Sequence, residues 1–277
     1  MGHFNNYLGL GIAGNFALHL EQAGEIEDFK DLEVEDENGP KGMFPFYLPG
    51  REGQLGVYPI SSDTIKLPDG DVNVQAEPEV ALICDITYVE GKVASITPTH
   101  FAAYNDCSIR KEGAKKISEK KNWGEASKGI SDELIPIDRF EAGGEMDSWH
   151  IASFLKRDGA VFRYGEDVEL TGYSYFYGKL TEWILNQMNT QVDVGPLEPL
   201  NEYIEAAGYP EKAIISIGAT RYTPYGETTF LKSGDEVIVV LYRNGDECDC
   251  KNKVLSKIAS GTLSCENGTS ILTQRVV

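Results

Sequence analysis

The sequence predicts an α+β protein in which strands outnumber helices. Eight short segments combine apolar and β-branched residues in the alternating or continuous runs typical of strands. A later stretch instead repeats apolar residues at the three- and four-residue spacing of an amphipathic helix. With 277 residues, of which 41% are hydrophobic, the chain can bury one large core. We therefore expect a mainly β core with helices at its periphery.

The predicted strands are spread along the chain, and the predicted helices lie between them. The strands are residues 7–12, 44–47, 80–88, 92–104, 149–155, 160–164, 213–218 and 236–242. The helices are residues 17–25, 175–189 and 200–207. Five apolar residues share one face of the second helix: Leu180, Trp183, Ile184, Leu185 and Met188. The third helix ends at Gly208, a residue type that often terminates helices.

Charge and composition limit the partners of the protein. Asp and Glu total 44 against 25 for Lys and Arg, and the net charge of -19 opposes binding to nucleic acid or to anionic membranes. The chain has no apolar run of about 18 residues and no secretory signal at its start, so we expect a cytoplasmic protein. Its five cysteines, an odd number, fit a reducing compartment.

Residues 111–121 form the one basic concentration of the sequence. Its clustered lysines are Lys115, Lys116, Lys120 and Lys121. Glu112 and Glu119 interrupt the cluster, and no aromatic residue is interleaved with it. A nucleic-acid patch usually combines basic and aromatic side chains, so we expect an exposed loop instead.

Paired acidic residues are the strongest sign of chemistry in the chain. Glu77 and Glu79 flank Pro78 at the entrance to the apolar strand 80–88, and an extended backbone directs residues i and i+2 to the same face. Two carboxylates in one buried space repel each other unless a cation or protons lie between them. Oxygen-rich clusters of this kind hold Mg²⁺, Mn²⁺ or Ca²⁺, although two such residues on their own are more often a solvated face.

Four motifs, which occur in the same order as in a known family, connect these residues to that family. The motifs are E-P-E at residues 77–79, N-D-C-S-I-R at 105–110, K-G at 128–129 and F-L-K-S-G-D-E-V at 230–237. Over roughly residues 7–245 the chain thereby resembles the fumarylacetoacetate hydrolase family. The signature of that family is an E-x-E strand followed by an N-D-x-S-x-R turn that carries a third acidic ligand.

The resemblance implies a fumarylacetoacetate hydrolase (FAH)-like fold, a mixed β-sandwich roll with peripheral helices, over residues 1–245. Residues 1–70 would supply N-terminal strands and a possible lid, and residues 71–245 would form the core roll. The acidic stretch 31–41 would be a solvated loop or part of this lid.

Residues 246–277 are expected to form a C-terminal extension, a small hairpin outside the main domain. The extension carries Cys248, Cys250 and Cys265. Three thiols at this spacing lack a clear fourth ligand for a thiophilic metal, so we expect free thiols.

The resemblance also implies a metal-dependent enzyme. Glu77, Glu79 and Asp106 would bind Mg²⁺ or Mn²⁺, with Ca²⁺ as an alternative ion. The substrate would be a 2-oxo or diketo acid, such as an acylpyruvate, a fumarylacetoacetate-like diketone or oxaloacetate, and its C–C bond would be cleaved by hydrolysis or decarboxylation. Lys128, which taken alone reads as a surface lysine, would stabilise the substrate carboxylate or the developing enolate. The family further suggests a homodimer.

The N-terminal motif matches the family in part. Asn15 and His19 fall in register with the family motif, but Gln22 occupies the position of the glutamate that forms a water-activating dyad with the histidine. Glu21 is adjacent, yet on a helix it points about 100° away. His19 would therefore act alone, since an unperturbed pKa of about 6.5 suits a general base. Decarboxylation needs no water nucleophile and tolerates this loss more easily.

The remaining family positions define the substrate contacts and the main alternative. The substrate-binding residues implied by the resemblance are Asn15, Gln22, Arg110, Gly218, Ala219 and Thr220. Arg110 is expected to pair with a neighbouring carboxylate rather than to contact the substrate. Leu48 follows the strand after which the family usually has a lysine, and Ala219 replaces a threonine. These departures leave open a catalytically silent protein that binds a small carboxylic acid.

Overall fold

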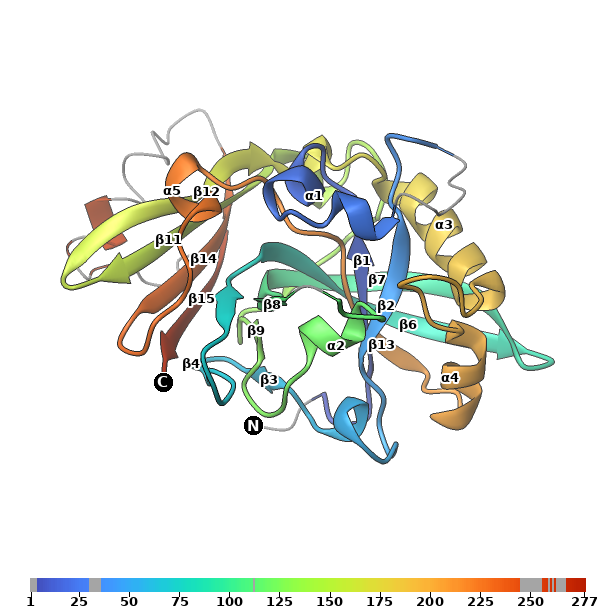
Figure 1. Ribbon diagram of the computed structural model, residues 1–277. Helices are drawn as coiled ribbons and strands as arrows, with labels where there is room; N and C mark the ends of the chain where they lie inside the picture. Colours follow the sequence, from blue (N-terminus) through green and yellow to red (C-terminus); the bar gives the residue numbers. More distant parts are fainter. Residues whose placement is uncertain are drawn as a thin grey trace.

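Two β-sheets form the framework of the computed structural model, which describes residues 4–29, 36–111, 113–244, 256–258, 260, 262 and 268–277. Cys248, Cys250 and Cys265 lie outside the described residues, as does part of the predicted acidic loop. This architecture fits the predicted mainly β class: most strands belong to these two sheets, and the helices lie around the sheets (Figure 1).

The first sheet is mixed and has eight strands. Seven of them follow the order β2 (Gly42–Tyr47), β1 (Leu8–Ala13), β13 (Lys212–Ser216), β6 (Pro78–Val89), β7 (Lys92–Asn105), β9 (Lys128–Ile130) and β3 (Ile60–Ser61). The eighth strand, β10 (Ile135–Pro136), pairs with β7. The β1/β13 and β3/β9 pairs are parallel and the other pairs are antiparallel.

The second sheet has five strands, and the C-terminus of the chain contributes to its interior. Their order is β12 (Ala160–Glu169), β11 (Trp149–Arg157), β14 (Glu236–Arg243), β15 (Thr269–Val276) and β4 (Thr64–Ile65). The expected C-terminal extension therefore needs correction: β15 pairs antiparallel with β14 and parallel with β4, so its described part is a strand of the main fold. A separate pair joins β5 (Asn73–Gln75) to β8 (Ser108–Arg110).

The helices lie around this framework, and the longest of them packs against β2 and β7 of the first sheet. The α-helices are α1 (His19–Gln22), α2 (Ser118–Lys121), α3 (Tyr177–Thr190), α4 (Leu200–Ala206) and α5 (Pro224–Glu227), and the 3₁₀ turns are η1 (Ile26–Phe29), η2 (Gln54–Gly56), η3 (Glu145–Ser148) and η4 (Leu170–Gly172). Leu180, Ile184 and Met188 of α3 are buried, as the spacing predicts. Within the described part of the chain, no helix combines the length and apolarity needed to cross a membrane.

The β6–β7 hairpin positions the acidic residues. Its two-residue turn, Glu90 and Gly91, has positive φ at both positions, which matches the twist of paired strands. Pairing runs back along the hairpin until Glu79 lies opposite Tyr104, and the N–H of Asp106 donates to the carbonyl of Glu77 at 2.9 Å. Both ends of the hairpin thus meet where the carboxylates are.

Two glycines of β1 make room for aromatic rings that pack on this side of the first sheet. A Cβ at Gly11 would lie 2.2 Å from the ring of Phe44, and one at Gly9 would lie 2.4 Å from the ring of Phe46. Any larger residue would displace these rings. Phe44 and Phe46 belong to the buried cluster that also contains Ala81 and Tyr104, the neighbours of the acidic residues along the hairpin.

Candidate metal centre

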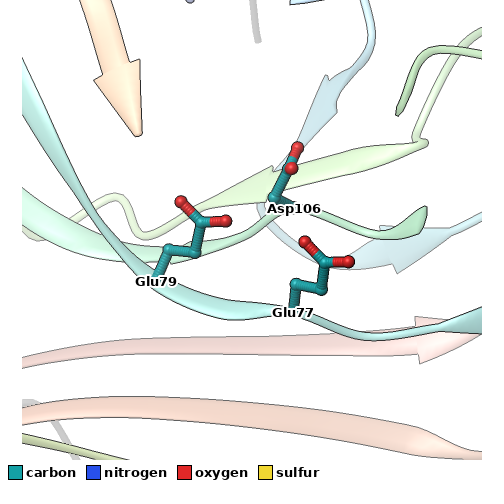
Figure 2. A group of neighbouring side chains, drawn as sticks. All are labelled: Glu77, Glu79 and Asp106. Atoms are coloured by element: carbon teal, nitrogen blue, oxygen red, sulfur yellow. The ribbon is translucent and has the colours of Figure 1, made fainter. Parts of the chain in front are cut away.

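Glu77, Glu79 and Asp106 meet at the open end of the β6–β7 hairpin. Glu77 precedes β6 and Glu79 is its second residue, so their side chains leave the same face of the strand. Asp106, the residue after β7, extends its carboxylate to the same side (Figure 2). One oxygen from each carboxylate can be chosen so that all three lie within 4.8 Å of one another. None of the three residues is more than 2% exposed. The predicted trio is therefore assembled and buried.

Three cations touch two of these carboxylates. The Lys121 ammonium lies 2.5 Å from Oε2 of Glu77 and 2.8 Å from Oδ2 of Asp106. Lys128 lies 3.0 Å from Oδ1 of Asp106, and Arg110 lies 2.8 Å from Oε1 of Glu77. Three positive charges thus face three carboxylates inside the protein.

Glu79 differs from its two neighbours in its charged contacts. Among the described residues, no lysine or arginine nitrogen lies within ion-pair distance of it, and its Oε2 accepts the N–H of Gly218 at 3.0 Å. Burial raises the pKa of Glu79 well above its usual range, and the charge of Asp106 raises it further. Burial also disfavours ionised Asp106, but Lys121 and Lys128 hold its pKa below the ordinary value.

Buried carboxylate oxygens without a good hydrogen bond make this group a suitable site for a divalent ion. Oε1 of Glu77 and both side-chain oxygens of Asp106 are buried and lack a hydrogen bond of good geometry, although the three cations lie within ion-pair distance of them. Buried oxygens normally have hydrogen-bond partners, so such a group marks a site for a ligand. Carboxylate oxygens are the donors that Mg²⁺, Mn²⁺ and Ca²⁺ accept, and Glu77, Glu79 and Asp106 would hold such an ion.

A second ion-pair group supports the first. Arg110 donates to Glu25 at 2.7 Å and also to Gln75 at 2.8 Å and to the Tyr222 hydroxyl at 3.1 Å. Lys120 lies 2.9 Å from the same oxygen of Glu25. Burial opposes ionisation of Glu25, but its cationic neighbours, with Arg110 foremost, lower its pKa to about 2. The prediction that Arg110 pairs with neighbouring carboxylates is confirmed.

His19 lies in α1, within electrostatic reach of Glu77, and is 4% exposed. Its ring stacks at a tilt on Tyr222 with 5.1 Å between centroids, and its Nδ1 has no hydrogen-bond partner. Burial lowers the pKa of His19 to about 4, so the imidazole is neutral at pH 7. The predicted helix over residues 17–25 is shorter than expected, because Leu18 adopts φ 68 and α1 spans one turn.

Asn15 and Gln22, predicted to bind substrate, are engaged by the backbone. The Asn15 amide donates to the carbonyls of Tyr175 and Ile217 and accepts the N–H of Tyr175. Gln22 donates to the carbonyl of Tyr222 and accepts its N–H. Asn15 thus fastens the turn between β1 and α1 to neighbouring loops, and Gln22 fastens α1 itself. The neighbour of Gln22, Glu21, is exposed and does not replace the missing glutamate.

The loop after β13 carries the last predicted residues. Gly218 supplies the N–H that binds Glu79, and Ala219 is buried. The hydroxyl of Thr220 is directed to the carbonyl of Pro78 at 3.4 Å. Thr220, which follows the position where Ala219 replaces the family threonine, is therefore turned toward the backbone of β6.

The structure corrects the expectation for the basic cluster and reveals residues that the sequence analysis missed. Lys120 and Lys121 are 5% and 4% exposed, so this part of the cluster is not an exposed loop. Both are drawn inward by Glu25, Glu77 and Asp106. The one feature of the sequence that could have indicated these buried lysines was their unexplained density. Lys128 is fully buried, as the family resemblance implied and its own residue type did not.

The fold is that of solved structures from the fumarylacetoacetate hydrolase family, which confirms the resemblance at the level of fold. Residues 25–276 match the model of a family of unknown function (DUF5718), and the chain belongs to that family. No curated protein matches the chain significantly.

Solved structures share the fold at low identity. The chain is similar to Cg1458 crystallised with an inhibitor, with 16% identity, a TM-score of 0.56, and coverage of 98% of this chain and 76% of the other. It is also similar to a protein designated HpcE from Mycobacterium smegmatis, with 16% identity, a TM-score of 0.54, and coverage of 98% and 74%. A third similar structure is a protein assigned to the fumarylacetoacetate hydrolase family from Yersinia pestis CO92, with 14% identity, a TM-score of 0.51, and coverage of 98% and 93%.

Proposed function

We propose that the protein is a divalent-metal-dependent enzyme that cleaves a C–C bond of a 2-oxo acid, with decarboxylation of an acid such as oxaloacetate as the first reaction to test. The buried trio of Glu77, Glu79 and Asp106 beside the fixed cation of Lys128 carries the proposal. When bound, Mg²⁺ or Mn²⁺ would act as a Lewis acid on the 2-oxo group. The FAH-family neighbours support this assignment through the shared fold.

Lys128 is suited to stabilise negative charge that develops on a substrate oxygen. Its ammonium donates to the carbonyl of Cys107 at 2.7 Å and lies against Asp106, and the residue is fully buried. A preorganised cation in a water-poor site stabilises such charge more strongly than one in water. Arg110 is held by several partners and serves to fix Glu77 in place.

The surroundings of His19 favour decarboxylation over hydrolysis. Hydrolysis requires an activated water, and an isolated imidazole with a pKa of about 4 is a weak base. Gln22 uses both ends of its amide on Tyr222 and offers His19 no carboxylate. Decarboxylation releases CO₂ and leaves an enolate that then takes up a proton, and neither step consumes a water nucleophile.

A catalytically silent protein that binds a small carboxylic acid is the second candidate. Gln22 and Ala219 favour it, because both lack groups that the family chemistry uses while the carboxylate trio stays complete. Such a protein would bind an unreactive dianion such as oxalate without converting any 2-oxo acid.

Loss of substrate absorbance from oxaloacetate and a panel of acylpyruvates, with Mn²⁺ or Mg²⁺ against a chelator, tests the proposal. The informative variant is Glu79→Gln, because Glu79 has a backbone partner and no ion pair to break. We expect a fall in turnover of about 100-fold or more, since one metal ligand is lost. Glu236→Gln in β14, whose partner is Lys156 in the second sheet, is the matched control and should retain activity.

The outcome separates the two candidates. Turnover that requires metal and Glu79 supports the enzyme. A folded protein that binds Mn²⁺ and oxalate but converts none of the acids is the silent binder, and the enzyme proposal then fails. We further propose a homodimer that acts in the cytoplasm, which sedimentation velocity and cell fractionation would test.

A further inference from the structure

Lys121 occupies an unusual position for a lysine. It is the last residue of α2 and is 4% exposed. Its ammonium bridges Glu77, which precedes β6, and Asp106, which follows β7, with the two distances of 2.5 Å and 2.8 Å given above. The same nitrogen lies 5.3 Å from the centre of the Phe44 ring. A single side chain thus joins both ends of the hairpin.

The ammonium lies where a metal ion would bridge the same oxygens. An Mg²⁺ ion binds carboxylate oxygens at about 2.1 Å, and larger divalent ions bind them at about 2.3–2.6 Å. A nitrogen already within 2.8 Å of both Oε2 of Glu77 and Oδ2 of Asp106 leaves no room for an ion between them. The two cations are therefore mutually exclusive on this pair of oxygens.

The charge of the site leads to the same conclusion. When all three carboxylates are ionised, as metal ligands must be, Glu77, Glu79 and Asp106 bring three negative charges, and Arg110, Lys121 and Lys128 oppose them with three positive ones. A divalent ion added to this arrangement would leave two uncompensated charges in a buried region, which is costly. Withdrawal of one lysine ammonium from the site lowers this uncompensated positive charge.

Lys121 is the cation best placed to withdraw. Arg110 is also held by Glu25, Gln75 and Tyr222, and Lys128 is also held by the carbonyl of Cys107. Among the described residues, the ion pairs of Lys121 are formed with two candidate metal ligands and no other group. Its helix has one turn, and the charge of Glu25 already acts on Lys121 where it lies.

Resting on the metal-dependent function proposed above, we propose that Lys121 is a counter-ion that competes with the divalent ion for Glu77 and Asp106. The ammonium holds the two carboxylates together without metal and leaves them when the ion binds. Lys121 is thus a positioning residue that sets the metal affinity of the site.

Calorimetric titration with Mn²⁺, without substrate, tests the competition. Lys121→Met and Lys128→Met each remove one charge that touches Asp106, so they form a matched pair. If Lys121 competes for the ion position, Lys121→Met should bind Mn²⁺ at least about tenfold more tightly than Lys128→Met, a factor equivalent to about 1.4 kcal/mol. Equal affinities would mean that charge alone matters, and they would overturn the proposal, as would a Lys121→Met protein that binds no Mn²⁺.

A measurement on the unmodified protein keeps the test independent of variant folding. Reductive methylation followed by peptide mass spectrometry reports the accessibility of each lysine amine. Lys121 should be protected without metal and become modified at saturating Mn²⁺, whereas unchanged protection would overturn the proposal. Because neither experiment measures turnover, a protein that shows the competition but converts no 2-oxo acid would lose the proposed catalytic function and keep this inference.

Discussion

Gly218 donates its backbone N–H to Oε2 of Glu79 at 3.0 Å, which joins the loop after β13 to the start of β6. Gly218 has φ +110, a conformation that side-chain-bearing residues rarely adopt, and a Cβ there would lie 3.1 Å from Cβ of Asn15. The glycine therefore allows the N–H to reach the carboxylate. Asn15 in turn holds the loop through the carbonyl of Ile217.

Gly218→Ala should destabilise the protein by about 2–4 kcal/mol, because the left-handed backbone and the contact with Asn15 both oppose a methyl group. Gly50→Ala is the control: Gly50 also has positive φ, but a Cβ there meets nothing within 4 Å. It should cost only about 1–2 kcal/mol. Urea denaturation of both variants measures the difference, and equal costs would mean that the contact with Asn15 is unimportant.

Glu79→Gln and Asp106→Asn should differ in stability although both remove a candidate metal ligand. Asp106→Asn leaves Lys121 and Lys128 without their shared partner and should cost about 3–5 kcal/mol. Glu79→Gln keeps an oxygen for the Gly218 N–H and should cost less than about 1 kcal/mol. Thermal or urea unfolding in the presence of a chelator decides this. A Glu79 variant as unstable as the Asp106 variant would contradict the assigned partners.

Glu198 gives the protein a pH-dependent stability outside the acidic trio. It is 3% exposed, Ser118 of α2 donates to its Oε1 at 2.6 Å, and its Oε2 has no partner. Burial raises the pKa of Glu198 from 4.5 to about 7. Between those pH values the folded state keeps a proton that the unfolded state releases, so stability falls as pH rises through this window.

Glu198→Gln should remove this loss. At pH 4.5 the variant and the parent protein should be equally stable, and at pH 8 the variant should be more stable by up to about 3 kcal/mol. Denaturation midpoints over pH 4.5–8 provide the measurement. A constant difference across the range would show that Glu198 does not titrate in it.

His19 should titrate near pH 4 rather than near 6.5, because burial disfavours the imidazolium. The folded protein then binds fewer protons than the unfolded chain between these values, so His19 lowers stability as pH falls from about 6.5 to 4. Carbon-13 or nitrogen-15 shifts of the His19 ring over this pH range are the measurement. A midpoint above 6 would mean that the imidazole is solvated or paired with a carboxylate.

The sequence predicts the long strands of this fold well and its short ones poorly. All eight predicted strands and the predicted helices at residues 175–189 and 200–207 exist, because apolar runs of this length carry a strong periodic signal. Strands of two or three residues, such as β3 and β10, depend on their sheet neighbours and leave no such signal. Strand β15 was missed because two of its inward residues, Ser270 and Gln274, are polar and are buried with partners elsewhere in the chain.

The residues of the candidate site also divide into those with a local sequence signal and those that depend on distant partners. Glu77 and Glu79 were predictable because they lie two residues apart at the start of a long strand, and Asp106 followed from the family motif after the next strand. Lys120, Lys121 and Glu25 were not, because their burial depends on partners far along the chain. A cluster of lysines is normally a solvated surface, and only tertiary contacts reverse that expectation.

The local pairing of the β6–β7 hairpin also has a consequence for folding, since we expect hairpins of this kind to form early. Neighbouring segments and a two-residue turn bring Glu77, Glu79 and Asp106 together, whereas the opposing cations arrive from the later elements β8, α2 and β9. An early hairpin therefore gathers negative charge before its counter-ions dock. Stopped-flow refolding should accelerate with added salt, which screens exposed charges. The acidic trio thus makes the first steps of folding sensitive to the ions of the medium, well before any site for chemistry exists.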